Sequence, residues 1–158
     1  MTYTIIVAAG SGSRFGADIP KQFLELCGRP VVMHTIYAFR EAFPDGEIVL
    51  VLAPSMITFW HELCTRHGFE SPRIAEGGAT RWESVRNAVQ SLKDAPAGAT
   101  VMVHDGARPL TEPALIRRVA SYALNTDGAL PAIPVSDSLR RLDDNEVTSE
   151  AVDRTLFR

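Results

Sequence analysis

Short apolar segments alternate with longer amphipathic segments along most of this 158-residue chain. Brief runs rich in β-branched residues and bounded by turn residues predict buried strands. We place strands at Tyr3–Val7, Ile48–Leu52, Arg73–Glu76 and Thr100–Val103, with a fifth candidate at Gly128–Val135. Because Pro131 and Pro134 cannot donate to a sheet ladder, this fifth segment is expected at an edge or in an irregular position.

Between the strands, apolar residues recur at the three- and four-residue spacing of amphipathic helices. Helix starts are indicated at Pro30, Ser55, Thr80 and Thr111, and the second helix should end near Gly68. Thr80 and Glu83 have the spacing of a capping box, which marks the third start. The inward stripe expected on the third helix is made of Trp82, Val85, Val89 and Leu92. The stripe expected on the fourth helix is made of Leu115, Ile116, Val119 and Tyr122.

This alternation predicts an α/β fold with a mainly parallel sheet and helices on both faces. The pattern changes after residue 135, where Ser138–Leu142 and Val147–Val152 flank a turn at residues 143–146. We expect a protruding β-hairpin arm there, and polar residues on both of its strands mean that it buries little without a partner surface. The chain is therefore divided into an α/β domain, residues 1–135, and an arm, residues 136–158.

A glycine-rich turn, residues 8–21, directly follows the first predicted strand. Gly10, Gly12 and Gly16 allow the backbone to take positive φ and to bring its N–H groups close to a ligand. Together with the cations Arg14 and Lys21, such a turn is typical of a phosphate site. The alternative is an ordinary strand–helix turn with two exposed basic residues.

Two better-known phosphate loops are excluded by the spacing of the residues. A Walker loop needs glycine directly before its lysine, but Pro20 precedes Lys21. A dinucleotide fingerprint needs a third glycine where Phe15 stands, which also disfavours a nicotinamide-dependent dehydrogenase.

Ligands of parallel sheets bind at the carboxyl ends of the strands. The charged residues expected at these ends are Arg14, Lys21, Arg81, Asp105, Arg108 and Asp137. Since four of these six are basic in a chain of net charge −3, we expect an anionic ligand with several phosphates. Asp105 is suited to contact a hydroxyl, to help hold a hydrated magnesium ion, or only to bond its own turn. His104, next to it, should point to the opposite face of the strand.

Composition narrows the function further. A net charge of −3 argues against nucleic-acid binding by bulk charge, and no apolar stretch has the length of a membrane span. The N-terminus lacks the pattern of a signal peptide, and Cys27 and Cys64 form no C-x-x-C pair, so we expect a cytoplasmic protein. The histidines have no partners at metal-ligand spacing, so no metal site made of protein groups alone is expected.

Five ordered motifs together resemble one family. They are residues 8–16 with Pro20 and Lys21, residues 77–85, residues 104–109, residues 134–138 and residues 152–154. The first resembles the opening of sugar-nucleotide pyrophosphorylases and cytidylyltransferases, and the set resembles the methylerythritol-phosphate cytidylyltransferases. The resemblance implies a Rossmann-like nucleotidyltransferase fold, a homodimer joined through the arm, and the reaction of CTP with 2-C-methyl-D-erythritol 4-phosphate. It also implies Mg²⁺ held mainly by the nucleotide phosphates and water.

The resemblance assigns roles to individual residues. The nucleotide would be bound by Ala8, Ala9, Gly10, Gly12, Gly77, Gly78, Ser84 and Asp105. The catalytic residues would be Arg14 and Lys21 at the α-phosphate, and Arg154 acting across the dimer. The second substrate, a polyol phosphate, would be bound by Asp105, Arg108, Asp137, Ser138 and Arg154. No residue of this chain is expected to be a direct metal ligand.

Members of this family continue past the Asp153-Arg154 pair, so we expect this chain to lack a C-terminal part of the pocket. Two alternatives stay open. One is the related ribitol-phosphate cytidylyltransferase activity, and the other is a non-catalytic nucleotide-binding or dimerisation module.

Overall fold

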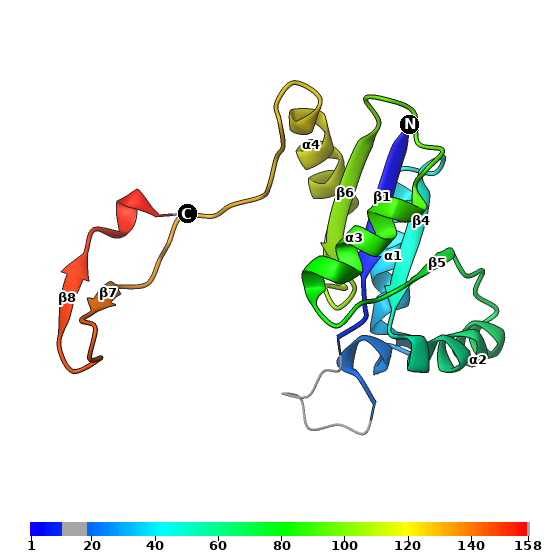
Figure 1. The fold of residues 1–158 in the computed structure, drawn as a ribbon, viewed down its shortest axis with the longest axis horizontal. Helices are drawn as coiled ribbons and strands as arrows, with labels where there is room; N and C mark the ends of the chain where they lie inside the picture. The colour runs from blue at the N-terminus through cyan, green and yellow to red at the C-terminus, as the bar shows by residue number, and fades with distance from the viewer. Residues whose placement is uncertain (11–18, 158) are drawn as a thin grey trace.

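The computed structural model describes residues 1–10 and 19–157 and is built on a parallel β-sheet (Figure 1). Its strands are β1 (Thr2–Val7), β4 (Glu47–Leu52), β5 (Arg73–Glu76) and β6 (Thr100–Asp105). In the described part of the chain they form a four-stranded sheet in the order β5-β4-β1-β6. Every neighbouring pair is parallel, so the first four predicted strands and the parallel sheet are confirmed.

Helices cover both faces of the sheet, as predicted. The helices α1 (Val31–Ala42), α2 (Ile57–His67) and α4 (Pro113–Ala123) join one buried apolar cluster. The helix α3 (Arg81–Ser91) joins the other. Successive strand residues point to opposite faces, so Ile6 lies in the first cluster and Ile5 in the second. Both faces of β1 and β4 are buried, so these two strands read as continuous apolar runs, whereas Val101 and Val103 of β6 are exposed.

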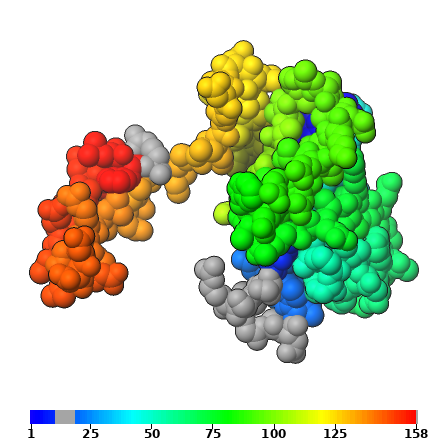
Figure 2. Space-filling view, viewed as in Figure 1, coloured from blue at the N-terminus to red at the C-terminus, as the bar shows by residue number. Residues whose placement is uncertain are grey.

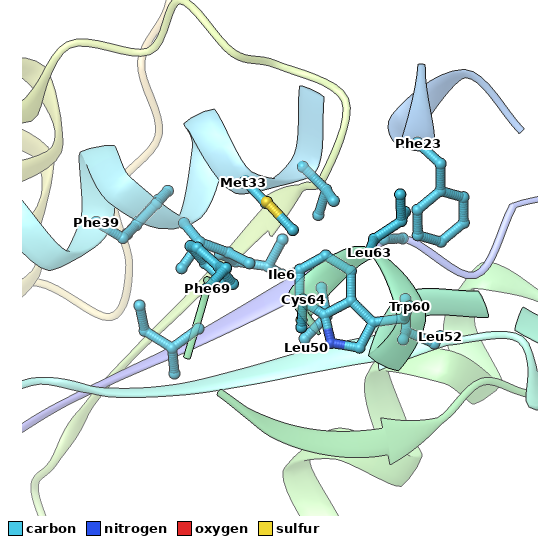
Figure 3. Close-up of a cluster of buried hydrophobic side chains, with 14 of the residues drawn as sticks. Ile6, Phe23, Met33, Phe39, Leu50, Leu52, Trp60, Leu63, Cys64 and Phe69 are labelled. Carbon is cyan, nitrogen blue, oxygen red and sulfur yellow. The ribbon is translucent and has the colours of Figure 1, made fainter. Parts of the chain in front are cut away.

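The larger cluster is centred on Trp60 of α2, which is fully buried (Figure 3). Its indole Nε1 donates a hydrogen bond to Ser71 Oγ at 2.8 Å. Its ring meets Phe69 edge-on, with 5.7 Å between the ring centroids. In Figure 3 the side chains of Leu50 and Leu52 from the sheet lie close to this indole. Packing and one hydrogen bond together fix α2 on the sheet.

The helix ends confirm two of the predicted signals and correct two others. Thr80 and Glu83 form the capping box, and Gly68 ends α2 with a left-handed φ of 56°. Ser55 does not cap α2, because a short 3-10 turn, η3 (Pro54–Met56), precedes it. Thr111 does not cap α4, which begins with a proline after Glu112 and has no side-chain cap. A proline at the first position already has helical φ.

The predicted stripe on α3 is wrong in part. Trp82 is 66% exposed and Val89 48% exposed, whereas Ser84 and Ala88 are buried. The helix therefore presents its small residues to the sheet, and the large apolar ones lie outside. On α4 the inward residues are Ile116 and Ala120, and the predicted Tyr122 is exposed. Each helix thus buries an alanine, Ala88 on α3 and Ala120 on α4, where the predicted stripe has larger residues, which hydrophobicity alone does not reveal.

The fifth predicted strand, Gly128–Val135, does not form. This segment runs as an extended connection away from the sheet (Figure 1), and Leu130 and Ile133 are both largely exposed. Pro131 and Pro134 remove two of the N–H groups that a strand would use. Among the described residues, no helix is long and apolar enough to cross a membrane.

The predicted hairpin is present, with β7 (Leu139–Leu142) pairing antiparallel with β8 (Ser149–Val152). The Asp143 carboxylate closes its turn by accepting hydrogen bonds from Val147 N and from the backbone and hydroxyl of Thr148. These hydrogen bonds lower the pKa of Asp143. Figure 2 shows the hairpin standing apart from the α/β part. The division between residues 135 and 136 stays a prediction.

The two tryptophans allow a matched test of this packing. Trp60→Ala should lower the free energy of unfolding by about 3–5 kcal/mol, because it opens a large cavity. Trp82→Ala removes an exposed ring whose one aromatic contact is with the Arg86 guanidinium, 4.7 Å from its centroid, and should change stability by at most about 1 kcal/mol. Chemical denaturation of both variants measures the difference. Equal losses would contradict the assigned orientation of α3.

Candidate active site

The carboxyl ends of the strands are joined by backbone hydrogen bonds just beyond the sheet. Ala8 N donates to Val51 O at 2.9 Å, and Gly106 N donates to Val7 O at 2.8 Å. On the other side Gly77 N donates to Leu52 O, also at 2.8 Å. These hydrogen bonds fix side by side the segments that begin at Ala8, Gly77 and Gly106, which come from three distant parts of the sequence.

These segments surround an open pocket of about 830 Å³, within the size range of small-molecule sites. Of the residues with predicted roles, those lining it are Ala8, Ala9, Gly10, Lys21, Gly78, Ser84, Asp105 and Arg108. Gly12 and Arg14 lie outside the described residues, as do Phe15 and Gly16. Most of the residues expected to bind the nucleotide, and two of those expected to bind the second substrate, thus lie at one place, and their roles stay predictions.

Close approach requires glycine at three positions of this edge. At Gly78 an added Cβ would lie 2.4 Å from the Cβ of Glu83, and at the other two it would meet the end of β1. A Cβ added to Gly77 would lie 2.5 Å from the Cβ of Ala9, and one added to Gly106 would lie 2.8 Å from the Cβ of Ala8. None of these three glycines has positive φ. Gly10 is different, because among the described residues its Cβ would meet nothing within 4 Å, and its φ is not positive. The positive φ that glycine allows is therefore not used at Gly10.

Ser84 is buried at the start of α3 and both of its described hydrogen bonds are to backbone. Its Oγ donates to Thr80 O at 2.9 Å and accepts from Gly78 N at 3.1 Å. Ser84 is not part of the inward stripe predicted for this helix, but it faces inward beside the sheet end. Its hydroxyl holds the Gly77-Gly78 turn against the N-terminus of α3, where the helix dipole favours negative charge.

Asp105 is shared by two arginines of the pocket. Arg81 donates to one carboxylate oxygen at 3.1 Å, and Arg108 Nε donates to the other at 2.9 Å. Partial burial by itself raises the pKa of Asp105, but the hydrogen bonds and charges of Arg108 and Arg81 outweigh it, so the pKa lies below its usual value. The carboxylate is therefore ionised near neutral pH and holds both guanidinium groups at the pocket wall.

His104 faces away from this pocket, which confirms the expected alternation with Asp105. Its ring packs against Phe39, with 5.0 Å between centroids, and its Nε2 lies 3.1 Å from Thr111 Oγ1. Burial lowers the pKa of His104, against the opposing effect of Asp105. The histidine is thus held mainly neutral in a packing role.

The described residues include no group of three or more histidine, cysteine or acidic side chains placed to hold a metal ion. Asp105 is the one carboxylate among the described lining residues, and both of its oxygens already accept from arginines. Mg²⁺ is often bound by one or two carboxylates together with substrate phosphates. The described pocket therefore fits a metal that arrives on a phosphate ligand and not a cage made by the protein.

The remaining predicted residues lie on the arm and are not brought to the described pocket. Asp137 and Ser138 are exposed before β7. Arg154 is also exposed and donates to Ser136 O within the arm. In Figures 1 and 2 the hairpin that carries them lies away from the strand ends.

Sequence reasoning assigned no site role to two polar lining residues, Arg81 and Gln22. Arg81 was counted among the charges at the strand ends, but its link to Asp105 joins positions 24 apart in sequence and depends on the fold. Gln22 is buried behind the turn and donates to the backbone of Ala8 and Gly10. Nothing in the local pattern distinguishes a buried glutamine at this position from an exposed one.

Comparison with family models matches residues 2–158 to the family described as IspD, 2-C-methyl-D-erythritol 4-phosphate cytidylyltransferase. Curated proteins with that name are similar to the chain. The one from Azobacteroides pseudotrichonymphae is 45% identical over 141 residues, which cover 89% of this chain and 62% of that protein. The one from Bacteroides thetaiotaomicron is 43% identical over 155 residues, with 98% and 68% covered.

A solved structure, 4-diphosphocytidyl-2C-methyl-D-erythritol synthase from Anaerococcus prevotii, matches with a TM-score of 0.74. The match covers 98% of this chain and 64% of that one at 22% identity, and at that identity it shows the fold. The chain spans 62% of the length of its Azobacteroides relative and 68% of its Bacteroides relative.

The glycines of the pocket provide a test of its construction. Gly77→Ala should lower the free energy of unfolding by about 1–3 kcal/mol, because the new methyl group overlaps Ala9. Gly10→Ala should change it by no more than about 0.5 kcal/mol, since the added Cβ meets open space. Denaturant titration of both variants measures the contrast. A loss at Gly10 as large as that at Gly77 would contradict the described strand-end packing.

Proposed function

The chain belongs to the IspD family of 2-C-methyl-D-erythritol 4-phosphate cytidylyltransferases, and we propose that it performs this reaction. CTP and 2-C-methyl-D-erythritol 4-phosphate would give CDP-methylerythritol and pyrophosphate, a step of non-mevalonate isoprenoid biosynthesis. The observation that carries the proposal is the pocket at the strand ends, where Lys21, Arg81 and Arg108 lie around the backbone of residues 8–10. Such a group of cations suits a triphosphate and a phosphate monoester brought together.

In this reaction an oxygen of the monoester phosphate attacks the α-phosphorus of CTP. A new P–O bond forms, and the bond to the β-phosphate oxygen breaks with pyrophosphate leaving. The attacking phosphate is mostly ionised at neutral pH, because its second pKa is about 6. The reaction therefore needs no general base, and the described pocket offers no strong one. His104 faces elsewhere, and Asp105, with its lowered pKa, is a weak base.

Catalysis in the proposed scheme depends on positioning and on charge neutralisation. Lys21, together with Arg14, would neutralise the charge that develops at the α-phosphate. The backbone of Ala8, Ala9, Gly10 and Gly12 would surround the phosphates, with Gly77, Gly78 and Ser84 near the base. Asp105 would meet the nucleotide and the second substrate. Arg108, Asp137, Ser138 and Arg154 would bind the polyol phosphate.

We propose that Mg²⁺ accompanies the nucleotide and is held by its phosphates and water. When bound, the ion neutralises triphosphate charge. This proposal is supported by the engagement of both Asp105 oxygens with arginines. Of the described groups, Asp105 is the one placed to meet a water of that ion. For the compartment we keep the expected cytoplasm, consistent with the free thiols of Cys27 and Cys64.

We further propose a homodimer in which each arm reaches the partner's pocket. Supporting this, the strands of the β7–β8 hairpin contain no buried residue, and their cross-strand contacts are largely polar, such as the ion pair of Arg141 with Glu150. A two-stranded hairpin is marginally stable alone in water. A two-fold dimer would cover both arms by one self-complementary contact and would bring Arg154 to a second pocket.

Pyrophosphate release tests the proposed reaction. With CTP and Mg²⁺, 2-C-methyl-D-erythritol 4-phosphate should support turnover, and ribitol phosphate should support it at least about 100-fold less well in kcat/KM, corresponding to 2.7 kcal/mol. Replacing CTP by ATP should abolish turnover. Calorimetry with the same nucleotides measures binding separately from chemistry. Turnover with ribitol phosphate at the higher rate would reject the named substrate, and tight CTP binding without turnover would indicate a binding module.

Action of Arg154 across the dimer is tested by mixing two inactive variants in a form of the protein that turns over. Lys21→Ala should lower kcat by about 100- to 1,000-fold, like loss of an oxyanion donor, and Arg154→Ala should also be nearly inactive. In a mixed dimer one site contains both lesions and the other contains none. Random reassortment makes about half of the dimers mixed, so about a quarter of the sites should recover. No recovery after demonstrated subunit exchange would place Arg154 in its own chain's site.

A further inference from the structure

Gln22 joins the two ends of the glycine-rich turn. Its side chain is buried, and its amide nitrogen donates to Ala8 O at 2.7 Å and to Gly10 O at 2.8 Å. An amide nitrogen has two N–H groups, and both are used here. One side chain thus holds the exit of β1 against the residues that follow the turn.

The other side of this link is anchored in the core. Gln22 lies in the 3-10 turn η2 (Lys21–Phe23), where Phe23 N donates to Pro20 O at 2.9 Å. The Phe23 ring is buried and meets Phe59 edge-on, with 5.7 Å between centroids. The turn η2 therefore cannot shift without disturbing the α2 packing. Lys21, which precedes Gln22, has a fixed backbone position relative to Ala8–Gly10.

We propose that Gln22 is a positioning residue, which sets where the Lys21 ammonium group stands relative to the backbone of Ala8–Gly10. The proposal rests on the proposed function, in which that backbone holds the nucleotide phosphates and Lys21 acts at the α-phosphorus. Misplacing a charged group by about 1 Å is enough to lower a rate about 100-fold. The nucleotide is also held from the Gly78–Ser84 side, so loss of Gln22 affects the chemical step more than nucleotide binding.

The amide is required chemically, because both of its partners are carbonyl oxygens. A methionine has similar length but no donor, so Gln22→Met leaves both carbonyls without this partner. A glutamate has the same shape, but its ionised form repels them. Burial and this repulsion raise the pKa of a glutamate here, and its protonated form restores one of the two hydrogen bonds. Gln22→Glu should therefore recover part of its function as the pH falls.

The test compares Gln22→Met and Gln22→Glu with the same substitutions at Gln90, an exposed residue of α3. Turnover is followed by pyrophosphate release and CTP binding by calorimetry. Hydrogen exchange of the Phe23 and Leu24 amides reports the η2 turn without any need for turnover. In Gln22→Met we expect these amides to exchange at least about 10-fold faster, with α1 as internal reference. We expect kcat to fall by about 10- to 100-fold and the CTP Kd to change less than about threefold.

For Gln22→Glu, kcat relative to wild type should rise as the pH is lowered from 8.5 to about 6, near the range where a buried carboxyl protonates. If Gln22→Met does not fold, the pH dependence of Gln22→Glu still tests whether Gln22 positions Lys21. Unchanged exchange at η2, equal changes in kcat and Kd, or a flat and wild-type-like pH ratio would overturn the proposal. If the wild type binds CTP but does not turn over, the proposed function fails, while faster exchange at η2 still supports the link made by Gln22.

Discussion

The pocket depends on how closely the end of β1 passes between its two neighbours. Ala8 lies against Gly106 on one side and Ala9 against Gly77 on the other, with no room for a further methyl group at either glycine. Backbone hydrogen bonds from Gly106 to Val7 and from Gly77 to Leu52 keep these contacts in place. Small side chains at four positions thus allow three segments to approach one ligand. The charged residues of the pocket belong to these segments or adjoin them, so the close approach of the segments also determines where the charges lie.

Charge is balanced around Asp105 before any ligand binds. The positive charges of Lys21, Arg81 and Arg108 would repel one another in an otherwise neutral pocket. The shared Asp105 carboxylate reduces that repulsion and orients the two arginines. Arg81 belongs to the N-terminus of α3 and Arg108 to the segment after β6. The carboxylate therefore links the helix that borders one side of the pocket to the loop that borders the other, and preorganisation of this kind favours electrostatic stabilisation.

The sequence was informative wherever a local rule governs the outcome. The apolar runs identified the strands, the spacing of Thr80 and Glu83 identified a capping box, and turn residues identified the hairpin. Sequence-based prediction was wrong where contact with another element of the fold decides which side chains are buried. On α3 the sheet accepts Ser84 and Ala88 and leaves Trp82 outside, although hydrophobicity favours the reverse. The buried Gln22 and the Arg81–Asp105 pair arise from long-range contacts that no spacing encodes. The cytidylyltransferase family was identified from five motifs that are far apart in sequence. Three of them contribute residues to the strand ends, and the other two lie in or beside the arm.

In the proposed function Ser84 lies near the cytosine, and its two hydrogen bonds would then limit which base edge it accepts. Its one proton is given to Thr80 O, and one lone pair accepts from Gly78 N. A hydroxyl in that state has a single remaining acceptor position and no donor. An exocyclic amino group, as on cytosine, is complementary to it, whereas the carbonyl oxygen that uracil has at the same ring position is not. In the proposed complex, the hydrogen bonds that close the Gly77-Gly78 turn would thus also set the polarity of one contact with the base, through the orientation of a structural side chain.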